Sequence, residues 1–173
     1  MELRILNNGK LQIDDARLTW FNFAGEKFGK GGERTFGVRI DTQEDADALY
    51  EAGYNVTIKP PREEGGMPFM VLKVKIKFNE FGPNVYLESG GNMRKLDEES
   101  ISMLDKIRIS SASLDISPYD STVGGVKYRT PYLRNMKVVQ FVEDRFAEEY
   151  DSYQCWYFAR KAWCIMRKEF LYV

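Results

Sequence analysis

Histidine is absent from this chain of 173 residues. Without an imidazole there is no Ser-His-Asp or Cys-His catalytic arrangement, no histidine metal ligand and no histidine general acid or base. Cysteine is scarce, because Cys155 and Cys164 are the only two. At a spacing of nine residues they would lie on opposite faces of a helix, which argues against a disulfide or a shared metal site. We expect two reduced thiols, as in a cytosolic protein.

Long apolar runs and a strong net charge are missing as well. No apolar run approaches the roughly 18 residues of a membrane span, and residues 1–10 lack the apolar segment of a signal peptide. The net charge is −1, so any nucleic-acid site must be a local basic patch. P-loop, dinucleotide and zinc patterns are absent. We expect a non-enzymatic protein without cofactor or metal.

Acidic groups keep one catalytic alternative open, a magnesium-dependent nuclease. The groups are Asp14-Asp15, Asp97-Glu98-Glu99 and the pair Asp115 and Asp120. Carboxylates of this kind can hold a magnesium ion. Nothing in the sequence places two of them on facing strand ends beside a lysine, so helix capping and solvated surface are the favoured interpretation.

The sequence does contain a series of short segments rich in β-formers, separated by glycine- and proline-rich loops. The expected strands lie within 11–23 and at 35–40, 55–59, 69–78, 84–88, 106–116 and 126–142, with loops at 24–34, 60–68 and 118–121. The apolar phase of 106–116 shifts, which predicts a bulge near Ser110 and Ser111. Asp41 and Glu44 predict the capping box of a short helix, and a second short helix is expected over 97–104.

This order predicts a mainly β domain, an OB-fold-like five-stranded partly open barrel with two short helices, over residues 1–150. Residues 151–173 differ, because apolar side chains recur there at three- and four-residue spacing. The chain is therefore expected to end in an amphipathic helical tail. The apolar residues of the tail are Trp156, Ala159, Trp163, Met166 and Phe170.

The segment 69–78 predicts a half-buried strand with a basic face. Successive side chains of a strand point to opposite faces, so Lys73, Lys75 and Lys77 share one face with Val71. Met70, Leu72, Val74, Ile76 and Phe78 share the core face. Taken alone, the lysine row is better explained as a solvated face than as a binding site.

Aromatic residues interleaved with basic ones strengthen the binding interpretation. Such mixtures suit single-stranded nucleic acid, because bases stack on rings and phosphates pair with cations. They occur in the loop of Lys27, Phe28, Lys30 and Arg34, at Lys59 and Arg62, at Arg94 and Lys95, and among Tyr119, Lys127, Tyr128, Arg129, Tyr132 and Arg134. Phe28 is expected to be exposed, whereas Trp20, Phe36 and Phe78 are expected in the core.

Several short motifs carry a family resemblance over about residues 10–150. They are Ala16–Gly25, Gly32–Asp41, Gly53–Val56, Lys59–Gly65, Gly125–Lys127 and Tyr132–Met136. They resemble a family of tailed-phage OB-fold single-stranded-DNA-binding proteins. The resemblance implies a replication or recombination accessory in the host cell cytoplasm, which coats exposed phage DNA without marked sequence preference. By matching position it implies contacts from Arg17, Phe21, Phe23, Arg34 and Lys127.

The tail departs from the family pattern and leaves a second function open. Many single-strand binders end in an acidic tip that recruits partners, whereas here the acids of 143–151 precede a basic aromatic end. In one interpretation, the acidic stretch 143–151 recruits partners as the acidic tip does in other single-strand binders. In a second, the terminal helix docks on phage replication or recombination proteins or on another copy of the chain. In a third, the segment is a non-native extension. The alternative function is therefore a protein-interaction module that works through this helix.

Overall fold

The computed structural model describes residues 1–27, 32–61, 66, 68–80 and 82–142, and the compact unit spans Met1–Phe141. The predicted tail of 151–173 lies outside the described residues. The strands are β1 (Glu2–Ile5), β2 (Leu11–Ala16), β3 (Leu18–Asn22), β4 (Arg34–Ile40), β5 (Val56–Lys59), β6 (Phe69–Ile76), β7 (Asn84–Ser89), β8 (Asn92–Leu96), β9 (Ile109–Val123) and β10 (Val126–Gln140). The helices are α1 (Gln43–Glu51) and the 3-10 helix η1 (Ser100–Asp105).

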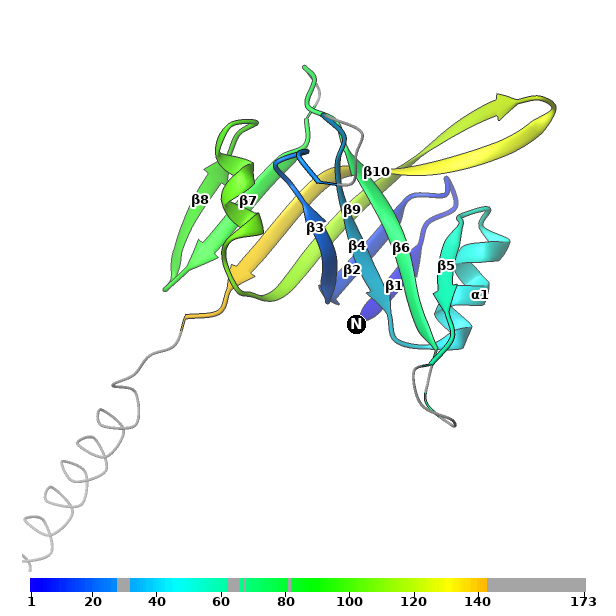
Figure 1. The fold of residues 1–173 in the computed structure, drawn as a ribbon, viewed down its shortest axis with the longest axis horizontal. Helices are drawn as coiled ribbons and strands as arrows, with labels where there is room; N and C mark the ends of the chain where they lie inside the picture. Colours follow the sequence, from blue (N-terminus) through cyan, green and yellow to red (C-terminus); the bar gives the residue numbers. More distant parts are fainter. Residues whose placement is uncertain (28–31, 62–65, 67, 81, 143–173) are drawn as a thin grey trace, which may run out of the picture. The chain divides into compact units, whose positions relative to one another are not determined.

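The strands form one sheet whose main path runs β1-β2-β9-β10-β6-β4-β3, with β5 beside β6 and with β7 between β10 and β8. Consecutive strands β2 and β3 lie far apart on this path, because β2 pairs with β9 and β3 pairs with β4. The segment 11–22 therefore links two remote parts of the sheet, which curls into a partly open barrel (Figure 1). The predicted mainly β, OB-like class is confirmed, and the sheet has ten strands where five were expected.

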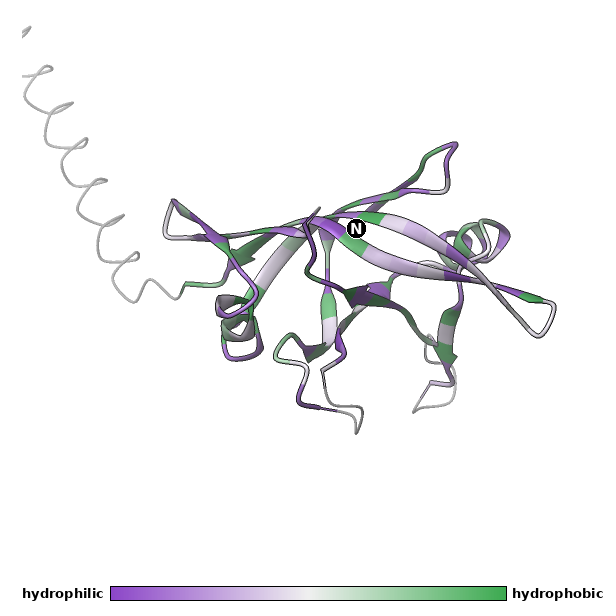
Figure 2. Cartoon of the chain, turned by 90° about the horizontal axis from the view of Figure 1, so that it is seen from above, coloured by the Kyte–Doolittle hydropathy of each residue, from purple (hydrophilic) through white to green (hydrophobic). Residues whose placement is uncertain are grey.

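The two-residue period of the strands builds the core. Phe36, Val38 and Ile40 of β4 are buried, as are Met70, Leu72, Val74 and Ile76 of β6 and Ala112, Leu114 and Ile116 of β9. Hydrophobic and hydrophilic segments are interspersed along the strands rather than gathered in long runs (Figure 2). Burial of each large apolar side chain contributes about 1.5–3 kcal/mol. In the described part of the chain, no helix is long and apolar enough to cross a membrane.

The structure confirms the predicted bulge and corrects one predicted loop. Val139 pairs with Ser111 and Gln140 pairs with Ile109, so Ser110 is the extra residue. Residues 118–121, expected as a loop, instead continue β9, where Pro118 lies opposite Pro131. The reason is that β9 and β10 form a long hairpin that extends away from the rest of the sheet (Figure 1). Strands β1 and β8 were not predicted.

The two short helices are present with shifted ends. Thr42, rather than Asp41, is the N-cap of α1, and its hydroxyl accepts from the amide of Asp45 at 3.2 Å. The second helix is the 3-10 helix η1, which begins after Asp97. Asp97 accepts hydrogen bonds from the hydroxyl and the amide of Ser100, and these bonds lower the pKa of its carboxyl.

Tyr54 and Arg129 connect the β9–β10 hairpin to the loop before β2 and to the end of α1. Its side chain is 1% exposed and its hydroxyl donates to the carbonyl of Gly9 at 2.6 Å. The guanidinium of Arg129 lies 5.8 Å from the centre of the Tyr54 ring. Arg129 also donates to both carboxylate oxygens of Asp120 at 2.7 Å and to the carbonyl of Ala52 at 2.6 Å. Three chain segments thereby meet at one buried ring.

We predict that Tyr54 makes the fold sensitive to alkaline pH. Burial raises the pKa of Tyr54 from 10.0 to about 12. The neutral ring therefore stabilises the fold fully below pH 10, and this contribution is lost as the pH rises towards 12. Between about pH 9 and about pH 11 the wild type should lose about 1 kcal/mol more unfolding free energy than Tyr54→Phe. Denaturant unfolding measures the difference, and parallel pH profiles would contradict it.

Candidate nucleic-acid interface

The register of β6 fixes which residues share its solvent side. Lys73 lies opposite Gly37 and Lys75 lies opposite Thr35 on β4. Phe69 lies opposite Lys59 on β5. Because paired residues point to the same side of a sheet, one surface collects these side chains. We call this surface the outer face and define it by Trp20, Thr35, Gly37, Arg39, Thr57, Lys59, Phe69, Val71, Lys73 and Lys75.

A hollow of about 380 Å³ lies at the centre of the outer face. We call it the Trp20 hollow, and its lining residues are Trp20, Thr35, Phe36, Gly37, Thr57, Lys59 and Lys73. Gly37 is required beneath it, because a Cβ there would lie 2.6 Å from Cγ1 of Val71 and 3.0 Å from Cγ2 of Thr19. Because Gly37 has no side chain, strands β3, β4 and β6 pack closely at this point. The surface of the outer face is therefore recessed there.

Trp20 is turned onto this face by an unusual backbone conformation. Its φ is 51°, in the left-handed region that bulky side chains rarely adopt. The register between β3 and β4 shifts between Thr19 and Asn22, so Trp20 sits in a bulge. The prediction that Trp20 belongs to the core is wrong, because its half-buried indole lines the hollow. A conformation of this kind costs about 1–3 kcal/mol and is typical of functional sites.

Each ring of the outer face has a cation beside it. The ammonium nitrogen of Lys59 lies 4.6 Å from the centre of the Trp20 ring. The guanidinium of Arg39 lies 5.5 Å from the centre of the Phe69 ring. The two rings also touch each other, with 5.8 Å between their centres and a tilt of 59°. The face thus offers aromatic surface and positive charge within one small area.

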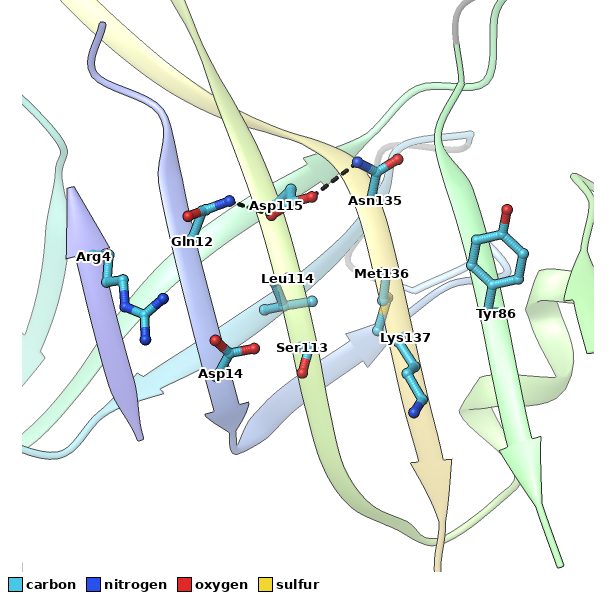
Figure 3. Close-up of a pocket in the computed structure, with 10 residues that line it drawn as sticks. All are labelled: Arg4, Gln12, Asp14, Tyr86, Ser113, Leu114, Asp115, Asn135, Met136 and Lys137. Carbon is cyan, nitrogen blue, oxygen red and sulfur yellow. Dashed lines mark hydrogen bonds between the residues drawn. The ribbon is translucent and has the colours of Figure 1, made fainter. Parts of the chain in front are cut away.

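Two other hollows among the described residues differ from the Trp20 hollow in charge. The one drawn in Figure 3 lies over β1, β2, β9, β10 and β7 and has Asp14 and Asp115 beside Arg4 and Lys137. Asp115 lies between Gln12 and Asn135, both of which donate to it. A further hollow is lined by Glu26, Glu98 and Glu99 together with Arg34. Carboxylates repel phosphate, whereas the described lining of the Trp20 hollow contains lysines and no carboxylate.

The comparison with known families agrees with this chemistry. The model of the phage ssDNA-binding domain family matches residues 3–154. The chain belongs to this family. The family resemblance predicted from the sequence motifs is therefore confirmed. The chain matches no curated protein sequence.

Solved structures show the same fold. One is the single-stranded DNA-binding protein from bacteriophage Enc34 in complex with ssDNA, at 14% identity and a TM-score of 0.51, covering 82% of this chain and 92% of that chain. Another is a C-terminal truncation of the Enc34 protein, at 13% identity and a TM-score of 0.50, covering 82% of this chain and 91% of that chain. At this identity the likeness concerns the fold alone.

Within this family fold, some predicted contact residues lie on or near the outer face. Lys59 and Lys73 line the Trp20 hollow. Lys75 is half-buried and forms an ion pair of 3.2 Å with Glu33, and Lys77 is exposed just beyond β6. Arg17 is exposed between β2 and β3. Predicted contacts Phe28, Lys30 and Arg62 lie outside the described residues.

The structure contradicts the prediction that Phe23 contacts DNA. Its side chain is 0% exposed and its ring centre lies 5.4 Å from that of Phe36, inside the core. Phe21 is half-buried and lies against Phe23 at 5.9 Å. Both phenylalanines were predicted from their position in the family motif. Matching by position does not show which way a side chain points after the bulge at Trp20.

Other predicted contacts have partners within the fold. Arg34 is bonded to Glu98 at 2.6 Å and lies over the Phe78 ring at 5.6 Å. The ammonium of Lys27 donates to the carbonyl of Phe21 at 3.0 Å. Lys127 and Tyr128 are exposed on the hairpin. The bonds of Arg129 to Asp120 and Ala52 give it a structural role at the base of that hairpin.

The prediction from the residues missed Trp20, Phe69 and Arg39. Phe69 could have been found, because it has the same odd-numbered parity as Val71, Lys73 and Lys75 on β6. Arg39 follows from the alternation of β4 in the same way. Trp20 could not, since its direction depends on the bulge rather than on alternation.

We predict that Arg129→Ala lowers the unfolding free energy by about 2 kcal/mol, because charge-assisted bonds to Asp120 and Ala52 are lost. Lys127→Ala, on the same strand and exposed, should change it by less than about 0.5 kcal/mol. Thermal or denaturant unfolding measures both variants. A stable Arg129→Ala protein that has lost DNA affinity would instead restore the predicted contact role.

Proposed function

We propose that the chain binds single-stranded DNA on the outer face and acts without catalysis as an accessory of phage DNA replication or recombination in the host cell cytoplasm. The observation that carries the proposal is the pair of touching rings, Trp20 and Phe69, each with a cation beside it. Membership in the phage ssDNA-binding domain family supports it. The Enc34 protein, which shares the fold, is described in complex with ssDNA.

The arrangement accounts for binding without sequence preference. A base stacks on an aromatic ring through its π-face, which every base has, and each stack contributes about 1–3 kcal/mol. Lys59, Arg39 and Lys73 surround the rings and supply positive charge for the phosphates. A base that stacks on Trp20 would displace the ammonium of Lys59 towards the neighbouring phosphate. A paired base in a duplex has no free face for such a stack.

We predict that Trp20→Ala weakens binding to a fluorescent oligo-dT by about 10- to 100-fold, because one stacked base is lost. Tyr50→Ala is the matched control, since Tyr50 is 75% exposed on α1 and is not part of the outer face. The Tyr50→Ala variant should bind oligo-dT with the affinity of the wild type. Equal affinities of all three proteins, or wild-type affinity for a duplex equal to that for the single strand, would overturn the proposal.

Salt dependence offers an independent measure of the same face. If Lys59, Arg39 and Lys73 each neutralise one phosphate, the logarithm of the association constant should fall with the logarithm of salt concentration with a slope of about −2. Lys73→Gln should make this slope shallower by about 0.7. Titrations of oligo-dT at several salt concentrations give both values, and an unchanged slope would remove Lys73 from the site.

Partner proteins stay a prediction. Docking on replication or recombination proteins, or on a second copy, was predicted for residues 151–173, which lie outside the described residues. The alternative function, an interaction module that works through this tail, rests on the same segment. Removing residues 151–173 and measuring both mass in solution and oligo-dT affinity separates the two functions, because the outer face lies entirely within Met1–Phe141.

A further inference from the structure

A second aromatic and basic hollow lies beyond the end of β6, where the hairpin leaves the sheet. Its volume is about 330 Å³, and its lining includes Lys77, Asn79, Tyr119, Tyr132 and Arg134. We call it the Tyr119 hollow. Its two tyrosine rings meet edge to face, with 5.9 Å between their centres and an angle of 86°. No carboxylate occurs among the described residues that line it.

Strand pairing makes the Tyr119 hollow a continuation of the outer face. Strand β10 contacts β6 through the pair Tyr132 and Lys75, so these two side chains point to the same side. Tyr119 lies opposite Thr130 and Tyr132 lies opposite Ser117, which places both rings on that same side of the hairpin. The lysine row of β6 therefore runs from the Trp20 hollow to the Tyr119 hollow, with Lys73 lining the first and Lys77 lining the second.

Exposure argues that the tyrosine pair is more than a packing contact within the hairpin. Tyr119 is 60% exposed, so most of its ring is open to solvent. The exposed surface of this ring is available for a base to stack on. An exposed ring beside lysine and arginine is the combination that single-strand binding sites use.

The length of the surface from Phe69, whose ring contacts that of Trp20, to Lys77 at the Tyr119 hollow suits a single strand. Phe69 and Lys77 are eight residues apart, which corresponds to about 26 Å along an extended chain. A stacked strand advances about 3.4 Å per nucleotide, so about eight nucleotides would cover this distance, and fewer would do so when extended. Site sizes of about 4–16 nucleotides are known for OB folds.

We propose that the Tyr119 hollow is a second subsite for the same single-stranded nucleic acid, joined to the Trp20 hollow by the lysine row of β6. The proposal rests on the proposed function, because it extends the same binding face. It adds that affinity depends on strand length. A strand too short to span the lysine row occupies the Trp20 hollow alone, whereas a longer strand stacks on Trp20 and on Tyr119.

The test uses the full chain and a double variant, Tyr119→Ala with Lys77→Ala. Both side chains are exposed, so the fold should survive, and thermal unfolding checks this. The matched control is Tyr50→Ala with Lys106→Ala, which removes an exposed tyrosine and an exposed lysine elsewhere. Affinities are measured for oligo-dT of about 4, 8, 12 and 16 nucleotides, the range known for OB folds.

The double variant should bind the shortest oligonucleotide within twofold of the wild type and the two longest about tenfold more weakly, since one stack and one phosphate contact are lost. The control should match the wild type at every length. An equal loss at all lengths, or no loss at any length, would overturn the second subsite. Failure of the proposed function looks different, because the wild type would then bind no oligonucleotide and Trp20→Ala would have no effect.

Discussion

The position of β6 in the sheet is the constraint on which the rest of the structure depends. This strand pairs with β4 along its length, with β5 at its beginning and with β10 near its end. Its even-numbered residues from Met70 to Ile76 supply the core, and its odd-numbered residues point to the outer face, where Val71 is buried and Lys73 is exposed. A register slip of one residue would bury Lys73 and expose Leu72, so core burial also fixes the interface.

The outer face depends on two local departures from regular β structure. Gly37 has no side chain where three strands crowd together, and this lets Val71 and Thr19 approach its backbone. Trp20 occupies a left-handed conformation within a bulge, which a regular strand would not allow. The strain at Trp20 is tolerated because the surrounding strands β3 and β4 pair on both sides of the bulge, at Leu18 and at Asn22. The strained backbone at Trp20 lowers the stability of the fold, and in this conformation the indole lies on the surface instead of in the core.

Alternation made most of the fold predictable from the sequence. It placed the lysine strand, its two faces and the bulge at Ser110 correctly, because these follow from the two-residue period. It failed where the period is broken or the pattern is weak. Trp20 was expected in the core, but the bulge that contains it turns its indole onto the surface. Phe23 was expected to contact DNA because of its position in the family motif, and it is buried. Strand β8 is exposed in all but Leu96, so no apolar alternation marked it.

The pairing between segments that are distant in the sequence could not be predicted, for a different reason. The contact between Tyr132 and Lys75 joins residues that no local pattern connects. The bonds of Arg129 likewise depend on the length of the β9–β10 hairpin, which could not be read from residues 118–121 because Pro118 and Asp120 favour loops. The sequence therefore identified the basic side chains as a group. Which of them lie on the outer face and which bond to other residues of the fold could be seen only in the structure.

The hairpin has a practical consequence for observing the molecule at work. Beyond Asp120, β9 pairs with β10 alone, and a Cβ added at Gly124 or Gly125 would meet no atom within 4 Å. Both glycines have positive φ, so a reporter dye is better attached next to the turn, at the exposed Lys127, where it would leave the packing of the barrel intact. Tyr54 and Arg129 hold the hairpin at its base, so the dye would have a fixed point of reference. Energy transfer from a dye on an oligonucleotide end would then reveal in which direction the strand runs across the sheet.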